Sequence, residues 1–182
     1  NDNAKFFAGV GVFKQDGIVI TTFNDKYTGR FNSEFKFLNG RVTAGENLSL
    51  TYQTGVYVSN LDEGAPINLA YGAQSIVPAV ITKPIKGTTH DFVVGEYGGQ
   101  GIAPRLGNIS NPYANLMRAK DNHNHSTNVM GSGYVDVSIV KGLNFRTTIG
   151  GTFYNGYVAN YNEKTYERAE NLAVSNMNEN SW

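Results

Sequence analysis

Two stretches near the amino terminus alternate between apolar and polar side chains. Within residues 27–38, the even positions up to Lys36 are polar and the odd positions are mostly aromatic: Tyr27, Phe31, Phe35 and Phe37. Residues 41–58 alternate in the same way, with exceptions at Glu46 and Thr54. A period of two gives a β-strand one apolar and one polar face, so the pattern predicts two long strands.

The dipeptide Asn39-Gly40 lies between these stretches and is typical of a two-residue type I′ hairpin turn. If Leu38 pairs with Arg41, the facing apolar pairs are Phe37–Val42, Phe35–Ala44, Phe31–Leu48 and Tyr27–Tyr52. Directly opposite residues share a face, so this match predicts the register as well as the turn. Ser33 then faces Glu46, a carboxylate on the apolar face that a β-bulge could turn inward.

Residues 124–140 and 143–157 predict a second hairpin from the same alternation. A two-residue loop at Lys141-Gly142 would set apolar positions opposite polar ones. A three-residue loop restores the match and pairs Ile139 with Phe145. In that register Asp136 and Arg146 lie diagonally on the polar face, where they could form an ion pair.

The predicted strands are longer than the five or six residues usual in globular proteins. Residues 4–14 predict a further strand, which makes about five. The ten steps from Tyr27 to Phe37 span about 33 Å along the strand. With a tilt of roughly 40°, that is about 25 Å of height, which is the apolar band of an outer-membrane barrel. Aromatic residues stand at both ends of this band, as they do at the two interfaces of such barrels.

The connections also alternate in length. The turns at 39–40 and 141–143 are tight, whereas the loop at about 15–26 is moderate and the loop at about 59–123 is very long. Short turns on one side and long loops on the other are typical of outer-membrane barrels. Because five strands cannot close a barrel, the sequence predicts an all-β, antiparallel transmembrane segment of a larger barrel.

Composition narrows the function. Fifteen basic and fifteen acidic side chains give no electrostatic footprint for nucleic acid, and the chain has no cysteine for a disulfide, a thiolate metal site or a nucleophile. His123 and His125 share a face in an extended segment, but spacing places no third metal ligand beside them. Asp62 and Glu63 are adjacent and so point to different sides. We therefore expect that the chain is not an enzyme and that it binds neither a metal nor a cofactor.

Four short motifs, in this order along the chain, resemble a stretch of the SusC-like TonB-dependent transporters: Phe13-Lys14-Gln15-Asp16-Gly17-Ile18-Val19, Gly45-Glu46-Asn47-Leu48-Ser49, Asn111-Pro112-Tyr113-Ala114-Asn115-Leu116 and Lys141-Gly142-Leu143-Asn144-Phe145. These transporters are multi-pass outer-membrane proteins of Bacteroidetes-type Gram-negative bacteria. The resemblance implies a 22-stranded barrel with an amino-terminal plug, capped by a SusD-like lipoprotein. It also implies uptake of oligosaccharides or peptides driven through TonB. Since the chain has no plug and no TonB box, we expect a mid-barrel segment in contact with outer-membrane lipid.

The long loop is the candidate functional region. We expect one short helix from Pro66 to about Val80 and a second one after the Asn111-Pro112 cap. Four loop residues are candidates for contact with substrate or lid, although packing of the barrel mouth or of the underside of the lid is the favoured explanation: Tyr71, Tyr97, Arg105 and Tyr113. Seven polar-face residues are expected to face the lumen, where they either contact the plug or line the path: Arg30, Asn32, Glu34, Asn47, Gln53, Asp136 and Arg146.

Two other functions fit the same strands. One is a soluble, secreted β-sandwich that binds glycans, and the other is a small porin-like barrel. A sandwich would bury Phe31, Phe35, Leu48, Leu50 and Phe145 between two sheets. A transporter or porin would leave them facing lipid.

Overall fold

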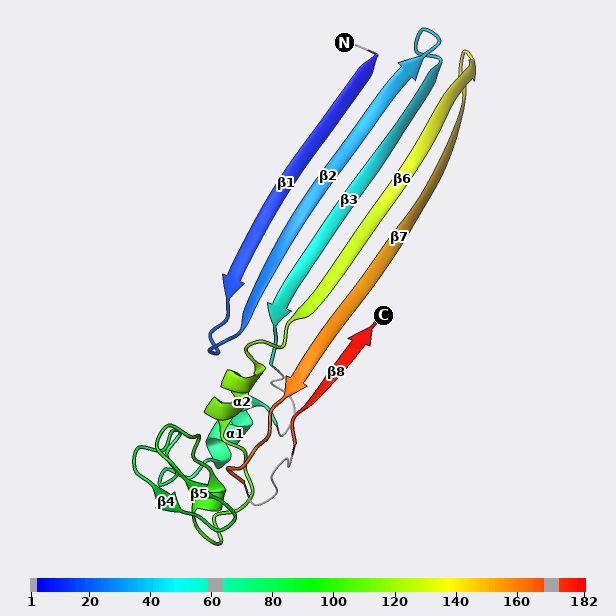
Figure 1. The fold of residues 1–182 in the computed structure, drawn as a ribbon. Coiled ribbons are helices and arrows are strands. Elements are labelled where there is room, and N and C mark those ends of the chain that lie inside the picture. Colours follow the sequence, from blue (N-terminus) through cyan, green and yellow to red (C-terminus); the bar gives the residue numbers. More distant parts are fainter. Residues whose placement is uncertain (1–2, 59–63, 169–173) are drawn as a thin grey trace.

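The computed structural model describes residues 3–58, 64–168 and 174–182. Its main feature is one antiparallel sheet of six strands in the order β1-β2-β3-β6-β7-β8 (Figure 1). The strands are Ala4–Asp16 (β1), Phe23–Phe37 (β2), Val42–Val56 (β3), Asn124–Val140 (β6), Leu143–Asn162 (β7) and Asn176–Ser181 (β8). The chain is therefore mostly β and antiparallel, as the alternation predicts.

The first hairpin has the predicted register. Phe37 pairs with Val42, Phe31 with Leu48 and Tyr27 with Tyr52. Asn39 and Gly40 both have positive φ, and the Arg41 amide donates to the Leu38 carbonyl at 3.2 Å, as a type I′ turn requires. Leu38 is left-handed as well, with a φ of 51°, so the tip of the hairpin contains three consecutive left-handed residues.

The second hairpin corrects the predicted three-residue loop. Val140 pairs with Leu143, so the loop is the two-residue Lys141-Gly142, and the register shifts between Ser138 and Val140. This bulge adds one residue to β6 and restores the match of faces that a two-residue loop alone would break. Phe145 consequently faces Val137 instead of Ile139, and Asp136 lies directly opposite Arg146.

Two further strands border this core of the sheet. β1 pairs with β2 along its whole length, from Ala4 opposite Phe35 to Asp16 opposite Phe23. β8 pairs with the last residues of β7 and makes six strands where about five are expected. Its sequence, Asn-Met-Asn-Glu-Asn-Ser, has no apolar alternation, which is why the pattern did not predict it.

The sheet is a single layer, and its apolar face is open. Phe31 is 39% exposed, Leu50 is 46% exposed and Phe145 is 57% exposed. In the part of the chain that the structure describes, no second sheet packs on this face, so the arrangement of a β-sandwich is not formed. Glu46 pairs without a register shift on both sides and stays on the apolar face, which rules out the bulge considered for it.

The long loop folds into a small unit beyond one end of the sheet (Figure 1). It contains helices Pro66–Gly72 (α1) and Pro112–Ala119 (α2), the hairpin Ile85–Lys86 (β4) with Asp91–Phe92 (β5), and the 3-10 helix Gln100–Ile102 (η1). The fully buried side chains Ile81 and Phe92 belong to this unit. We call residues 64–123, together with the packed segment 163–168, the loop unit.

The helix α1 is shorter than the expected span from Pro66 to Val80. It ends at Gly72, and Ala73 is already extended with a ψ of 127°. Pro78 disfavours helical backbone at the preceding residue, and Gly72 lies so close to Ile109 that a Cβ would collide with it. Across the described ranges, no helix has the length and apolar character needed to cross a membrane.

Candidate functional site

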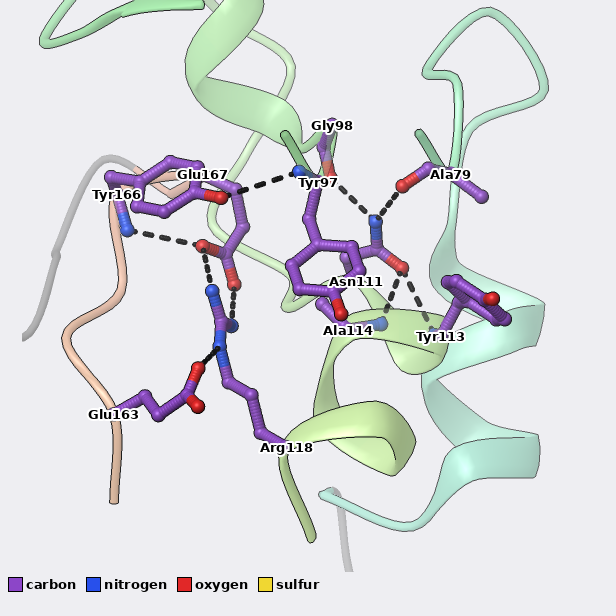
Figure 2. Close-up of polar contacts among 10 residues, drawn as sticks. All are labelled: Ala79, Tyr97, Gly98, Asn111, Tyr113, Ala114, Arg118, Glu163, Tyr166 and Glu167. Atoms are coloured by element: carbon purple, nitrogen blue, oxygen red, sulfur yellow. Dashed lines mark hydrogen bonds and ion pairs between the residues drawn. The ribbon is translucent and has the colours of Figure 1, made fainter. Parts of the chain in front are cut away.

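Asn111 joins three segments of the loop unit through one side chain. Its Oδ1 accepts hydrogen bonds from the amides of Tyr113 at 2.9 Å and Ala114 at 3.2 Å, which caps α2 as the Asn-Pro sequence predicts. Its Nδ2 donates to the carbonyls of Ala79 at 2.8 Å and Gly98 at 2.7 Å (Figure 2). The residue is 7% exposed, so these four bonds tie α2 to the two preceding segments away from water.

Arg118, at the other end of α2, forms a buried ion pair with Glu167. Its Nη1 lies 2.6 Å from Glu167 Oε1 and its Nη2 lies 3.2 Å from Oε2, in a forked arrangement (Figure 2). The two side chains are 9% and 1% exposed. Glu163, which is half exposed, lies 3.5 Å from Arg118 Nε. The loop between β3 and β6 is therefore fastened to the segment that follows β7.

The ion pair shifts the pKa values of both groups. Burial raises the pKa of Glu167, but the hydrogen bonds from Arg118 and from the Tyr166 amide, with the charge of Arg118, outweigh it and leave the pKa below its ordinary value. Burial lowers the pKa of Arg118, and its bonds to Glu167 outweigh that effect and raise it. Both groups are thus held in their charged forms, and a pair of this kind suits a structural fastening better than proton transfer.

Aromatic rings and glycines complete the surroundings of the pair. The Arg118 guanidinium lies 5.1 Å from the centre of the Tyr97 ring and 5.8 Å from that of Tyr166. The Tyr97 amide donates to the Tyr166 hydroxyl at 3.3 Å. A Cβ on Gly99 would collide with the Glu167 carbonyl, so this close approach of backbone requires glycine.

The four candidate loop residues do not form one cluster. Tyr97 and Tyr113 meet edge to face with ring centres 6.1 Å apart. Tyr71, on α1, is 89% exposed, and Arg105 is exposed in a left-handed turn after η1. Contact of any of the four with substrate stays a prediction.

The histidines take part in ring contacts. Tyr52 and His125 share a hydrogen bond of 2.8 Å, and His123 packs edge to face on Phe23. His90 bonds to Glu96 at 3.0 Å. Among the described residues, no three His, Cys, Asp or Glu side chains gather as a metal site would need. Asp62 and Glu63 lie outside the described residues.

The seven polar-face candidates do share one face of the sheet. Arg30 pairs with Ser49, Asn32 with Asn47, and Asp136 with both Thr43 and Arg146. A shallow hollow of about 450 Å³ on this face is lined in part by Arg30, Asn32 and Asn47. Gln53 donates to Asn24 at 2.8 Å. Whether this face meets a plug or a solvated path stays a prediction.

A row of interacting side chains crosses the polar face near the tight turns. Lys5 lies 3.7 Å from Glu34, which accepts a hydrogen bond from the Tyr134 hydroxyl at 2.9 Å. Tyr134 reaches Glu34 by lying across Gly45 on the strand between them, where a Cβ would meet its ring at 2.6 Å. The Arg146 guanidinium lies 4.2 Å from the centre of the Tyr134 ring, so Arg146 contacts an aromatic ring instead of forming the expected pair with Asp136.

Sequence reasoning did not single out Glu167 or Gln100. Both are polar, both are almost fully buried, and each bonds to a group distant in sequence: Glu167 to Arg118, and Gln100 to the Ile109 amide. A single sequence gives no spacing that reveals such pairs. The cap at Asn111 was recognisable because its partners are local.

Comparison with known proteins adds one relative. Over 176 residues, which is 96% of its length, the chain is 24% identical to the TonB-dependent receptor P39 of Formosa agariphila. The chain spans 15% of the length of that protein. No protein-family model matches the chain. The similarity thus supports the TonB-dependent receptors as relatives of this chain, in agreement with the motifs that resemble them.

Proposed function

We propose that the chain forms part of the barrel wall and one extracellular loop of a SusC-like TonB-dependent transporter in the outer membrane. The observation that carries this proposal is the open apolar face of a single-layer sheet. Phe31, Leu50 and Phe145 are exposed over long, regularly paired strands. A large apolar face of this kind is unfavourable in water but matches the hydrocarbon around a β-barrel.

Rows of aromatic rings at the two ends of this face support a membrane location. At the loop end the row runs across β2, β3, β6 and β7: Tyr27, Tyr52, His125 and Tyr157. At the end with the tight turns, Phe35 contacts Phe6 and Phe37. Barrels in outer membranes carry such aromatic girdles at both interfaces.

The placement of the connections supports the proposed orientation. Both tight turns lie at one end of the sheet and the loop unit lies at the other (Figure 1). Outer-membrane barrels have short periplasmic turns and long extracellular loops, so the loop unit would face outward. There it would meet a SusD-like lipoprotein, while the seven polar-face residues would meet the plug.

In this proposal the remaining strands of a 22-stranded barrel would cover both edges of the sheet, since an open edge in hydrocarbon leaves backbone groups unpaired. The barrel would import oligosaccharides or peptides with energy supplied through TonB. We assign no catalytic role to any residue of the chain.

A pair of single-cysteine variants tests the wall assignment. Leu48 and Asn47 are neighbours at one height on opposite faces, and the chain has no other cysteine. In the intact outer-membrane protein, we expect a bimane dye on Leu48→Cys to be quenched by nitroxides on lipid acyl chains. The same dye on Asn47→Cys should be insensitive to them. Equal quenching at both positions, or none at Leu48→Cys, would contradict the proposal.

Energy dependence separates the transporter from a porin. Uptake through the intact protein should stop when TonB is removed from the cell, whereas diffusion through a porin would continue. Continued uptake of the same solute would replace the transporter with the porin-like barrel.

A further inference from the structure

Two carboxylates on the apolar face of the sheet differ in their surroundings. Asp25 pairs with Thr54, which lies on the same face of β3 as Glu46. Lys14 Nζ lies 3.1 Å from Asp25 Oδ2. Among the described residues, none offers the Glu46 carboxylate a hydrogen bond or an ion pair. The chain thus supplies a cation for Asp25, whereas a cation for Glu46 would have to come from another molecule.

Glu46 stands in a hollow of the apolar face. Ser33 and Gly133 lie directly opposite it on β2 and β6, and the large side chains Phe6 and Ile149 follow on the next strands. The hollow has a volume of about 380 Å³. Besides Glu46, its lining includes Ser33, Phe35, Ala44, Gly133 and Ile149. The carboxylate is therefore flanked by two of the smallest residues and bordered by apolar side chains.

The glycine in this hollow is not required by the chain itself. Apart from its chain neighbours, the nearest atom to a Cβ at Gly133 would be the Gly45 carbonyl oxygen at 3.8 Å, and the φ of Gly133 lies outside the left-handed region. Glycine weakens the interior of a strand and often marks a place where a ligand approaches the backbone closely. Gly133 leaves open space directly beside the carboxylate, where an atom of a ligand could reach it.

The position of Glu46 along β3 places it near one surface of the membrane. It is four residues from Val42, where β3 begins, so at about 3.3 Å per residue and a tilt of roughly 40° it lies about 10 Å from the end of the strand. Phe35, which contacts Phe6 and Phe37, pairs with Ala44, two residues nearer that end. In the proposed orientation this end lies in the periplasmic leaflet, and Glu46 lies just inside the level of the lipid headgroups.

Charge and polarity indicate the class of ligand. A carboxylate attracts a cation, and a primary ammonium brings three N–H donors together with its charge. The apolar border of the hollow fits hydrocarbon chains. A phospholipid with an aminoethyl headgroup, such as phosphatidylethanolamine, carries both parts in one molecule. A headgroup whose one charge is a phosphate would bring a second negative charge towards Glu46.

We propose that Glu46 and the hollow around it form a binding site for a phospholipid with a primary ammonium headgroup in the periplasmic leaflet. The ammonium binds the carboxylate, and an acyl chain lies against the apolar border of the hollow. This inference rests on the proposed position of the sheet in the outer membrane. It goes beyond general contact with lipid, because it names one headgroup and the residue that selects it.

Lipid titration of the intact, delipidated protein in detergent, followed by native mass spectrometry, tests the site. The probes are phosphatidylethanolamine and phosphatidylglycerol with identical acyl chains. We expect the unchanged protein to bind phosphatidylethanolamine about tenfold more tightly, since one charge-assisted hydrogen bond accounts for about this factor. Glu46→Gln should lose the preference. Asp25→Asn, which removes a carboxylate that already has a cation, is the matched control and should keep it.

A second variant tests the hollow without changing the charge. Gly133→Val should fill the space beside Glu46 and weaken the binding of phosphatidylethanolamine about fivefold, because the added side chain occupies the place of the ligand. Folding is checked by the melting temperature without added lipid. Glu46→Gln should leave this temperature equal or raise it, since a neutral side chain suits an apolar face better than a charge.

Several results would overturn the site: equal binding of the two lipids by the unchanged protein, a preference that survives Glu46→Gln, loss of the preference in Asp25→Asn, or unaltered binding in Gly133→Val. A lower melting temperature of Glu46→Gln without lipid would overturn it as well, because Glu46 would then have a structural role. A dimer that Glu46→Gln dissociates would assign the hollow to a second copy of the chain. Lipid quenching at Leu48→Cys tests the wall itself, so quenching that persists while the site fails would leave the transporter standing.

Discussion

The sheet and the loop unit differ in how far they bury their own apolar side chains. The loop unit has a core of its own, with Phe92 and Ile81 each 1% exposed, and it also contains a buried ion pair. The sheet has five long strands and the short β8, yet Val56 is its one apolar side chain in the buried core of the described residues. The loop unit thus shields its apolar side chains from water by itself, whereas the stability of the sheet depends on what covers its faces.

Replacing one phenylalanine in each region gives the largest contrast. Phe92→Ala should destabilise the loop unit by about 3–5 kcal/mol, because it leaves a cavity in a small core. Phe145→Ala removes a half-exposed ring from the sheet and should leave the loop unit unchanged. Hydrogen exchange of peptides from both regions, in the intact protein, measures the two effects. Similar loosening of the loop unit by both changes would contradict the division into two regions.

Breaking the buried ion pair is expected to have the next largest effect. Arg118→Ala leaves Glu167 charged and buried, and should destabilise the loop unit by up to about 3 kcal/mol. Glu163→Gln, at the half-exposed partner, should cost at most about 1 kcal/mol and serves as the control. Limited proteolysis within residues 64–123 reports the difference. If both variants resisted cleavage as the unchanged protein does, the pair would not fasten the loops.

Acid should loosen the loop unit through Glu167. Because its folded pKa is depressed, the stability it contributes is present above the ordinary glutamate value of 4.5 and is lost as the pH falls through the folded pKa. The protection of α2 amides, taken relative to the intrinsic exchange rate at each pH, should therefore fall as the pH drops below 4.5, and Glu163→Gln should keep this response. Glu167→Gln should show faster exchange already at neutral pH and little further change on acidification. A response unaltered by Glu167→Gln would assign the transition to another group.

The smallest expected effect lies on the polar face of the sheet. Gly45→Ala places a Cβ against the Tyr134 ring and should displace its hydroxyl from Glu34, which lowers the melting temperature of the intact protein slightly. Gly133→Ala, where the nearest atom is 3.8 Å from the new Cβ, is the control and should have no effect. Equal melting temperatures in both variants would show that Tyr134 does not need Gly45.

The sequence was informative wherever a rule is local. Alternation and the Asn39-Gly40 turn predicted the register of the first hairpin, and the Asn111-Pro112 sequence predicted the cap of α2. The predicted loop length of the second hairpin was wrong, because the strand contains one bulge. Alternation predicts which face each residue lies on, but it cannot distinguish a longer loop from an extra residue in the strand.

What the sequence could not provide is pairing between distant polar residues. Glu167 follows β7 with no pattern around it, and only the packing of α2 brings Arg118 to it.

The bonds between Asn122 and the backbone of Tyr161 have a mechanical consequence. They occupy both backbone groups of Tyr161, as a neighbouring strand would, and so hold the segment that follows α2 beside β7. Arg118 bonds to Glu167 in the segment that directly follows β7, so α2 is held both beside the strand and just beyond its end. If β7 tilted, the loop unit would therefore move together with it and would not change its orientation independently of the strand.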